Sequence, residues 1–158
     1  MDSTALPQVG QAAPDFSLAS TAGGTQKLDK LKGRTVVLYF YPKDETPGCT
    51  KEACDFRDHR DDLKRAGVVV LGVSMDDLAS HRRFRAKEKL TFPLLADTDG
   101  RVSRAYGVLR QRERDGKSFT YIERTTFVID KTGHIARVWP RVSVSGHVED
   151  VLAFVRGS

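Results

Sequence analysis

Two runs of consecutive apolar residues constrain the fold most strongly. They are TVVLYFY at Thr35–Tyr41 and VVVLGVS at Val68–Ser74. Both are rich in β-branched and aromatic residues, and neither alternates between apolar and polar positions. Such continuous runs are typical of strands that are buried on both faces of a sheet. The chain is therefore expected to form a central sheet whose two faces are covered by helices.

A helical pattern follows each of the two runs. Between residues 47 and 66, one apolar stripe carries Cys49, Ala53 and Phe56, and Gly67 supplies a stop at the C-terminal end. Residues 77–89 form a second, mostly charged pattern. Shorter helices are predicted at residues 102–106 and 148–155.

The remaining segments predict further strands and turns. The first 34 residues indicate an extended arm with a hairpin, for which Gly23-Gly24 is the turn candidate. A second hairpin is predicted around Asp115-Gly116. The other strands are expected at residues 93–96, 108–112, 119–122, 125–130 and 135–139. The predicted fold class is α/β, with a central mixed β-sheet flanked by helices and an N-terminal hairpin segment. At 158 residues, the chain is expected to be a single domain spanning 1–158.

Charge and hydropathy exclude several functional classes. No apolar run approaches the roughly 18 residues of a membrane span, and the first residues carry no secretory signal. The net charge is +5. The basic residues at 82–87 and between 101 and 114 are interleaved with acidic ones and lack a base-stacking aromatic motif. We therefore expect a cytoplasmic protein with no membrane or nucleic-acid partner, and a monomer because no obligate interface is indicated.

The segment from Tyr41 to Cys54 is the most informative one for chemistry. It joins the first buried strand to the first long helix, at the sheet edge where α/β proteins bind ligands. Thr46 suits the N-cap and Pro47 suits the first helical position. Cys49 then lies in the first helical turn, where the helix dipole favours an anion. A thiol in that position is expected to be partly thiolate at neutral pH and therefore nucleophilic.

Cys49 and Cys54 are the only cysteines of the chain. Their C-x4-C spacing is not the C-x-x-C of disulfide oxidoreductases, and the four histidines complete no zinc site with them. From spacing alone, two interpretations remain open. The pair has a redox role, or it consists of two small buried side chains without a role.

The motif formed by Pro42, Thr46 and Cys49, P-x-x-x-T-x-x-C, resembles the active-site motif of peroxiredoxins. The longer string YPKDETPGCTKEAC is similar to the Q-type peroxiredoxins, also called bacterioferritin comigratory proteins. The resemblance continues through GVSMDDLASHRRF, FPLLADTDG, RTTFVIDKTGHI and SGHVEDVL. It therefore extends from about residue 10 to the end of the chain.

The resemblance implies a thioredoxin-like fold and a thiol-dependent peroxidase that reduces hydrogen peroxide and organic hydroperoxides. Cys49 takes the place of the peroxidatic cysteine, and Thr46 that of the hydroxyl that binds the peroxide. Pro42 takes the place of the residue that shields the thiolate from water, and Arg124 that of the arginine beside the thiolate. Cys54 takes the place of the resolving cysteine. An intramolecular Cys49–Cys54 disulfide, recycled by thioredoxin or a similar dithiol reductant, is implied, with no metal, flavin or haem cofactor.

A continuous helix over both cysteines adds a conformational expectation. Five residues of α-helix separate two Cα atoms by about 8.6 Å, whereas a disulfide tolerates at most about 7 Å. The helix must therefore unwind before the bond can form. The alternative function is a thioredoxin-like redox sensor or holdase, which would be oxidised once and would not sustain peroxide consumption.

Overall fold

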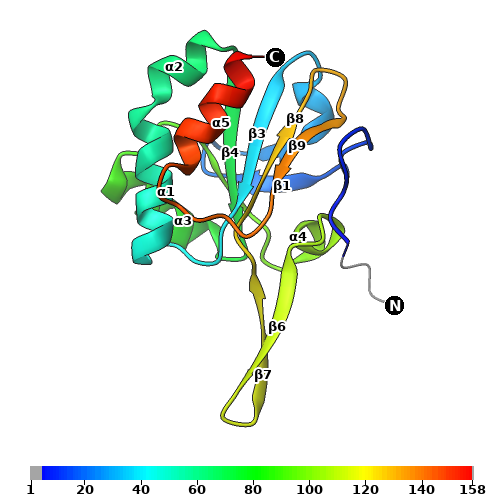
Figure 1. Ribbon diagram of the computed structural model, residues 1–158. Coiled ribbons are helices and arrows are strands. Elements are labelled where there is room, and N and C mark those ends of the chain that lie inside the picture. The colour runs from blue at the N-terminus through cyan, green and yellow to red at the C-terminus, as the bar shows by residue number, and fades with distance from the viewer. Residues whose placement is uncertain (1–4, 158) are drawn as a thin grey trace.

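The computed structural model describes residues 5–157. These residues form a seven-stranded mixed sheet with helices packed around it (Figure 1). The strand order is β2-β1-β5-β4-β3-β8-β9. β3 is parallel to β4, and β4 to β5, while the other pairs are antiparallel. The mixed sheet confirms the predicted fold class. The strands are β1 Ser17–Ser20, β2 Thr25–Lys27, β3 Thr35–Phe40, β4 Val68–Ser74, β5 Leu94–Ala96, β8 Thr125–Ile129 and β9 Ile135–Trp139.

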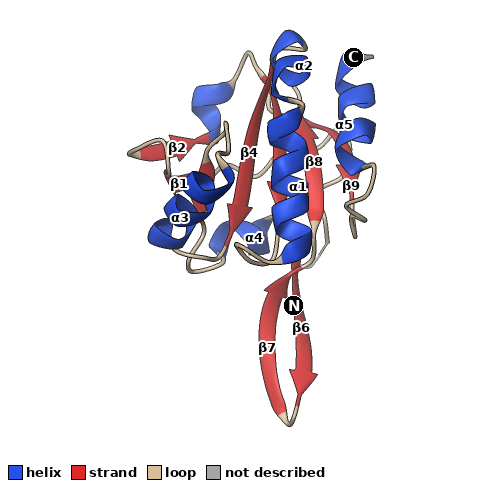
Figure 2. Cartoon of the chain, turned by 90° about the vertical axis from the view of Figure 1, so that its left-hand side faces the viewer, coloured by secondary structure: helices blue, strands red, loops and turns tan. Residues whose placement is uncertain are grey.

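Helices cover both faces of this sheet. Side chains of α1, α2, α3 and α5 pack into one core cluster, on the face turned toward the viewer in Figure 2. The opposite face is covered by α4, the 3-10 turn η1 and the N-terminal segment around Phe16. The helices are η1 Leu28–Leu31, α1 Pro47–Asp58, α2 Arg60–Arg65, α3 Leu78–Glu88, α4 Arg101–Ala105 and α5 His147–Arg156.

Strand β3 explains why its sequence is continuously apolar. Val37 and Tyr39 pack on the α1 side of the sheet, whereas Leu38 and Phe40 pack on the α4 side. Its neighbours β4 and β8 cover both of its edges. The central position of β3 therefore excludes water from both faces, as the sequence predicted.

The predicted helix over residues 47–66 is interrupted at His59, which separates α1 from α2. The His59 backbone leaves the helical region, with φ −98° and ψ 19°. Its ring Nδ1 lies 2.9 Å from the Asp55 carbonyl oxygen, to which the His59 backbone N–H also donates. A side chain that binds a nearby carbonyl competes with helix propagation. The break lies beyond Cys54, so a single continuous helix, α1, still carries both cysteines.

A two-stranded hairpin extends from the body (Figures 1 and 2). It consists of β6 Leu109–Arg114 and β7 Lys117–Ile122, and both strands are longer than predicted. Asp115 and Gly116 form the predicted turn, with φ 54° and 77°. Positive φ at both positions is what a tight two-residue hairpin requires. The hairpin leaves the body at the end where β3 finishes and α1 begins.

Candidate active site

The loop between β3 and α1 is fixed by a buried polar network. The Tyr41 hydroxyl donates to Asp44 Oδ1 at 2.6 Å. His81 Nδ1 lies 2.7 Å from Asp44 Oδ2, and His81 Nε2 lies 3.0 Å from the Leu95 carbonyl oxygen. The His81 ring thereby links the Asp44 carboxylate to the backbone of β5.

The ionised state of Asp44 follows from the same contacts. Burial disfavours the carboxylate, but hydrogen bonds from His81, Tyr41 and Ser80 outweigh that effect and lower the pKa of Asp44. The Asp44 backbone N–H donates to Asp76 Oδ2 at 2.6 Å. The loop that precedes α1 is thereby tied to α3 and to the end of β4.

Cys49 lies in the first turn of α1, as predicted, and is buried. Thr46 stands at the N-cap, but its side chain makes no capping bond to the helix. Its hydroxyl instead donates to the Lys43 carbonyl oxygen at 3.0 Å. Thr46 therefore occupies the N-cap position predicted for it, while the loop carbonyl, not the helix, orients its hydroxyl. The oxygen lone pairs of Thr46 are left to accept another donor.

Arg124, in the junction between β7 and β8, reaches Cys49. Its Nη2 donates to Cys49 Sγ at 3.4 Å, and its Nη1 donates to Glu52 Oε1 at 2.7 Å. Gly48 leaves room for this approach, because a Cβ there would lie 3.1 Å from Nη2. The structure thus brings Cys49 and Arg124 into contact, with Thr46 at the start of the same helix.

Glu52 is a site residue that the sequence interpretation missed. Its side chain is fully buried, and burial raises its pKa to about 7 although Arg124 opposes the rise. Within residues 5–157, neither Glu52 Oε2 nor the buried Tyr39 hydroxyl has a hydrogen-bond partner. The available signal was position: Glu52 follows Cys49 by three residues and precedes Phe56 by four, on the buried stripe of α1.

Cys54 lies farther along α1 and is half-buried. Its Sγ contacts Glu88 Oε1 at 3.5 Å, at the end of α3. Arg57 Nη1 donates to the Glu88 carbonyl oxygen at 2.6 Å. Burial raises the pKa of the Cys54 thiol; Arg57 opposes this rise and the hydrogen bond to Glu88 adds to it. Both cysteines are free thiols in this structure.

Pro42 is half-buried and opens the loop, one residue after Tyr41. Between residues 5 and 157, no group of three or more His, Cys, Asp or Glu side chains is arranged to hold a metal ion. Over the same described residues, none of the helices has both the length and the apolar character needed to span a bilayer.

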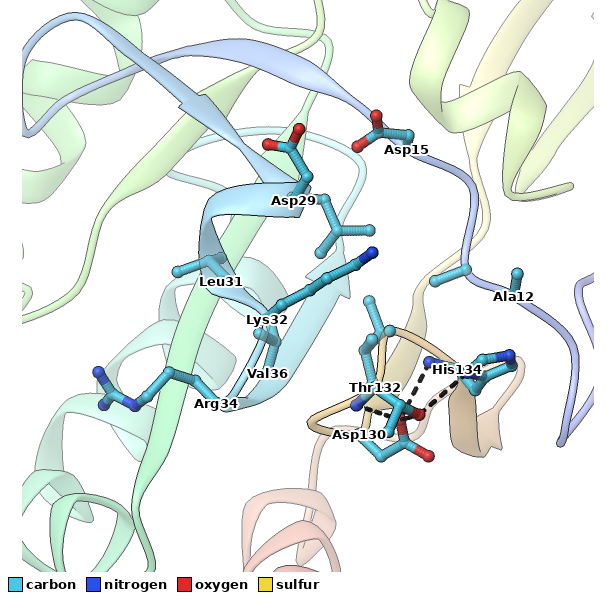
Figure 3. Close-up of a pocket in the computed structure, with 14 residues that line it drawn as sticks. Ala12, Asp15, Asp29, Leu31, Lys32, Arg34, Val36, Asp130, Thr132 and His134 are labelled. Carbon is cyan, nitrogen blue, oxygen red and sulfur yellow. Dashed lines mark hydrogen bonds between the residues drawn. The ribbon is translucent and has the colours of Figure 1, made fainter.

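A separate cleft of about 280 Å³ lies at the opposite end of the sheet (Figure 3). Its apolar wall includes Val36, at the start of β3, and Ile129, at the end of β8. At the rim of the cleft, Asp130 accepts a hydrogen bond from the Thr132 hydroxyl, which also contacts the His134 ring. Neither cysteine lines this cleft, so it is distinct from the site around Cys49.

Comparisons with known proteins place the chain in a family. Residues 9–138 match the AhpC/TSA family. A putative peroxiredoxin Bcp of Coxiella burnetii is 54% identical over 145 residues, which cover 92% of this chain and 96% of that protein. Peroxiredoxin Bcp of Bacillus subtilis is 44% identical, with 92% of both chains covered.

Solved structures show the same likeness. The Xanthomonas campestris bacterioferritin comigratory protein, studied for alkyl peroxide reduction, superposes with a TM-score of 0.89 at 36% identity, covering 95% of this chain and 98% of that one. The peroxidoxin BcpB of Mycobacterium tuberculosis gives a TM-score of 0.85 at 35% identity, covering 96% of this chain and 97% of that one.

Proposed function

Because this chain belongs to the AhpC/TSA family, among the Bcp and Q peroxiredoxins, we propose that Cys49 is the thiolate with which it attacks peroxides. Its fold is the thioredoxin-like fold of that family, and its activity is thiol-dependent peroxide reduction. One observation carries the assignment of the nucleophile. Cys49 lies at the N-terminus of α1 with Arg124 Nη2 3.4 Å from its sulfur.

The first step is a displacement at oxygen. The Cys49 thiolate attacks one peroxide oxygen, the S–O bond forms as the O–O bond breaks, and the leaving oxygen takes up a proton as water or an alcohol. Cys49 is oxidised to a sulfenic acid while the peroxide is reduced. Negative charge spreads over the sulfur and both oxygens, where the Arg124 guanidinium and the first-turn N–H groups stabilise it. Thr46 positions the peroxide through its hydroxyl, and Pro42 shields the thiolate from water.

The second step uses Cys54. Its thiol condenses with the sulfenic acid, which forms the Cys49–Cys54 disulfide and releases one water. In α1 the two Cα atoms are separated by about 8.6 Å, which is too far for a disulfide. The first turns of α1 must open, and the contact between Cys54 and Glu88 must break. A thioredoxin-like dithiol then reduces the disulfide by exchange.

The cellular setting follows from this cycle. We place the enzyme in the cytoplasm, where two free cysteines stay reduced between turnovers. It acts as a monomeric single domain without a metal, flavin or haem.

Peroxide consumption beyond one equivalent tests the function. With excess hydrogen peroxide and thioredoxin, the wild-type protein should consume many equivalents, and without a reductant it should stop after about one disulfide per chain. A redox sensor or holdase would stop at that single oxidation even with the reductant present. That result would overturn the assignment as a peroxidase.

A further inference from the structure

The β6–β7 hairpin has one face that is strongly basic and aromatic. In an antiparallel pair, residues directly opposite one another project from the same face. The register places Arg112 opposite Phe119, Arg110 opposite Tyr121, and Arg114 opposite Lys117. These six residues are called the basic face below. The other face carries Gln111 opposite Thr120, Glu113 opposite Ser118, and Leu109 opposite Ile122.

The basic face is largely free within the part of the chain that the structure describes. Arg110 is engaged by Glu123 and by backbone carbonyls, but Arg112, Arg114 and Lys117 form no ion pair there. The Arg112 guanidinium covers the Tyr121 ring at 5.1 Å from the centroid. Phe119 is 42% exposed, one of only two large apolar side chains so exposed among the described residues.

The hairpin lies where the disulfide must be reduced. β7 leads through Glu123 directly to Arg124, which contacts Cys49. At its base, Ile122 packs into the cluster on the α4 side of the sheet. Because successive strand residues alternate between faces, Tyr121 is turned away from that cluster.

We propose that the basic face docks the acidic surface of the dithiol protein that reduces the Cys49–Cys54 disulfide. This inference rests on the proposed function. Arginine and aromatic side chains are the groups enriched at protein–protein contacts, and three unpaired cations select an acidic partner. A two-stranded hairpin without a third strand or a covering helix is marginally stable in water, so contact with a partner would also stabilise it.

The distances allow one small protein to touch both places. Phe119 lies five residues from Arg124, or about 17 Å along an extended strand. A domain of 100 residues has a radius of gyration of about 13 Å. A reductant that contacts Phe119 can therefore also reach the disulfide.

The basic face favours a protein partner over single-stranded nucleic acid. Nucleic-acid sites of this kind stack successive bases on open aromatic rings. On this hairpin the Tyr121 ring is already covered by Arg112, which leaves Phe119 as the one open ring of the face.

Two double variants with the same change in net charge provide the test. R112Q/R114Q removes two positive charges from the basic face, and R82Q/R83Q removes two positive charges from exposed arginines of α3. Peroxide turnover is measured with an acidic bacterial thioredoxin and, separately, with dithiothreitol. R112Q/R114Q should lower kcat/KM for thioredoxin about tenfold, mainly through KM, and should weaken its salt dependence. The rate with dithiothreitol should stay unchanged, and R82Q/R83Q should match the wild type in both assays.

Several results would overturn the docking proposal. Equal losses in the two variants would show an effect of net charge alone, and no loss in either would remove the hairpin from docking. A loss with dithiothreitol as well would assign the hairpin to the chemistry. Binding of a labelled single-stranded oligonucleotide that R112Q/R114Q abolishes, with thioredoxin kinetics unchanged, would identify nucleic acid as the partner. Failure of the wild type to react with peroxide would instead refute the proposed function.

Discussion

The guanidinium of Arg124 donates to the sulfur of Cys49 at 3.4 Å, although 75 residues separate the two in the chain. The antiparallel pairing of β3 with β8 creates this contact, because it brings the start of β8 to the end of β3, where α1 begins. The same guanidinium holds Glu52 at 2.7 Å. One arginine thereby contacts the Cys49 sulfur and pairs with a buried carboxyl group of the same helix.

Arg124→Lys should slow the oxidation of Cys49 by hydrogen peroxide by about ten- to a hundredfold. A lysine keeps the charge but cannot donate in two fixed directions to Cys49 and Glu52. Stopped-flow measurement of the single-turnover rate provides the readout. Arg141→Lys, at an exposed arginine paired with Glu123, is the matched control and should react like the wild type. An unchanged rate in Arg124→Lys would show that the paired geometry is unimportant.

Tyr39 and Tyr41 should respond in opposite ways to replacement by phenylalanine. Both side chains are buried in the same core cluster, two residues apart in the chain. The Tyr41 hydroxyl donates to Asp44, whereas the Tyr39 hydroxyl has no hydrogen-bond partner among the described residues. Tyr39→Phe removes an unsatisfied hydroxyl and should raise the free energy of unfolding by about 1 kcal/mol. Tyr41→Phe removes a bond to a carboxylate and should lower it by about 2 kcal/mol. Denaturant titrations of both variants decide the matter, and equal signs would contradict the assignment.

Glu52→Gln should alter how stability depends on pH. The pKa of Glu52 in the folded protein is about 7, above its ordinary value of 4.5. Between these values the folded state binds the proton more tightly, so raising the pH across this window lowers stability, by up to about 3 kcal/mol. The variant should therefore gain stability relative to the wild type from pH 4.5 to 7. If the difference in stability between Glu52→Gln and the wild type did not vary with pH, the raised pKa of Glu52 would be refuted.

His147 also titrates in this pH range, so the wild type and Glu52→Gln must be compared at each pH. Burial lowers its pKa to about 4 from its ordinary value of 6.5. The unfolded state then binds the proton more tightly between these values, and stability rises with pH. The wild-type pH profile combines both opposing slopes, whereas the difference between the wild type and Glu52→Gln isolates the carboxyl group.

Opening of α1 should be visible by hydrogen exchange. We expect residues 46–60 to lose protection when the Cys49–Cys54 disulfide forms, because the intact helix holds the cysteines too far apart. Residues 147–156 of α5 serve as the internal reference and should exchange equally in both states. Equal protection of residues 46–60 in the reduced and oxidised proteins, with the disulfide verified by mass, would contradict this conformational step.

Much of the fold could be predicted because local sequence and tertiary environment agree. The apolar run of β3 indicated a strand covered on both faces, and Asp115-Gly116 indicated a tight turn. The break at His59 could not be foreseen, because it depends on a ring that binds a nearby carbonyl within an otherwise helical pattern. The orientation of the Thr46 hydroxyl likewise depends on where the Lys43 carbonyl lies.

The contact between Cys49 and Arg124 could be anticipated from the family resemblance, whereas the residues around the two could not. Glutamate is ordinarily exposed. The burial of Glu52 could therefore be predicted only by knowing that Arg124 lies beside it. The bond between Asp44 and His81 joins residues 37 apart, and only the packing of α3 against the loop reveals it. The basic face of the hairpin was likewise hidden, because it depends on the register of β6 against β7.

The reaction of Cys→Ser variants with hydrogen peroxide, followed by intact mass, tests the central claim most directly. Cys49→Ser should gain no oxygen and form no disulfide. Cys54→Ser should gain one oxygen at the wild-type rate and, with excess peroxide, more, because no neighbouring thiol traps the sulfenic acid. If both variants lost the first oxidation equally, or if Cys49→Ser were oxidised at Cys54 as fast as the wild type, Cys49 would not be the nucleophile.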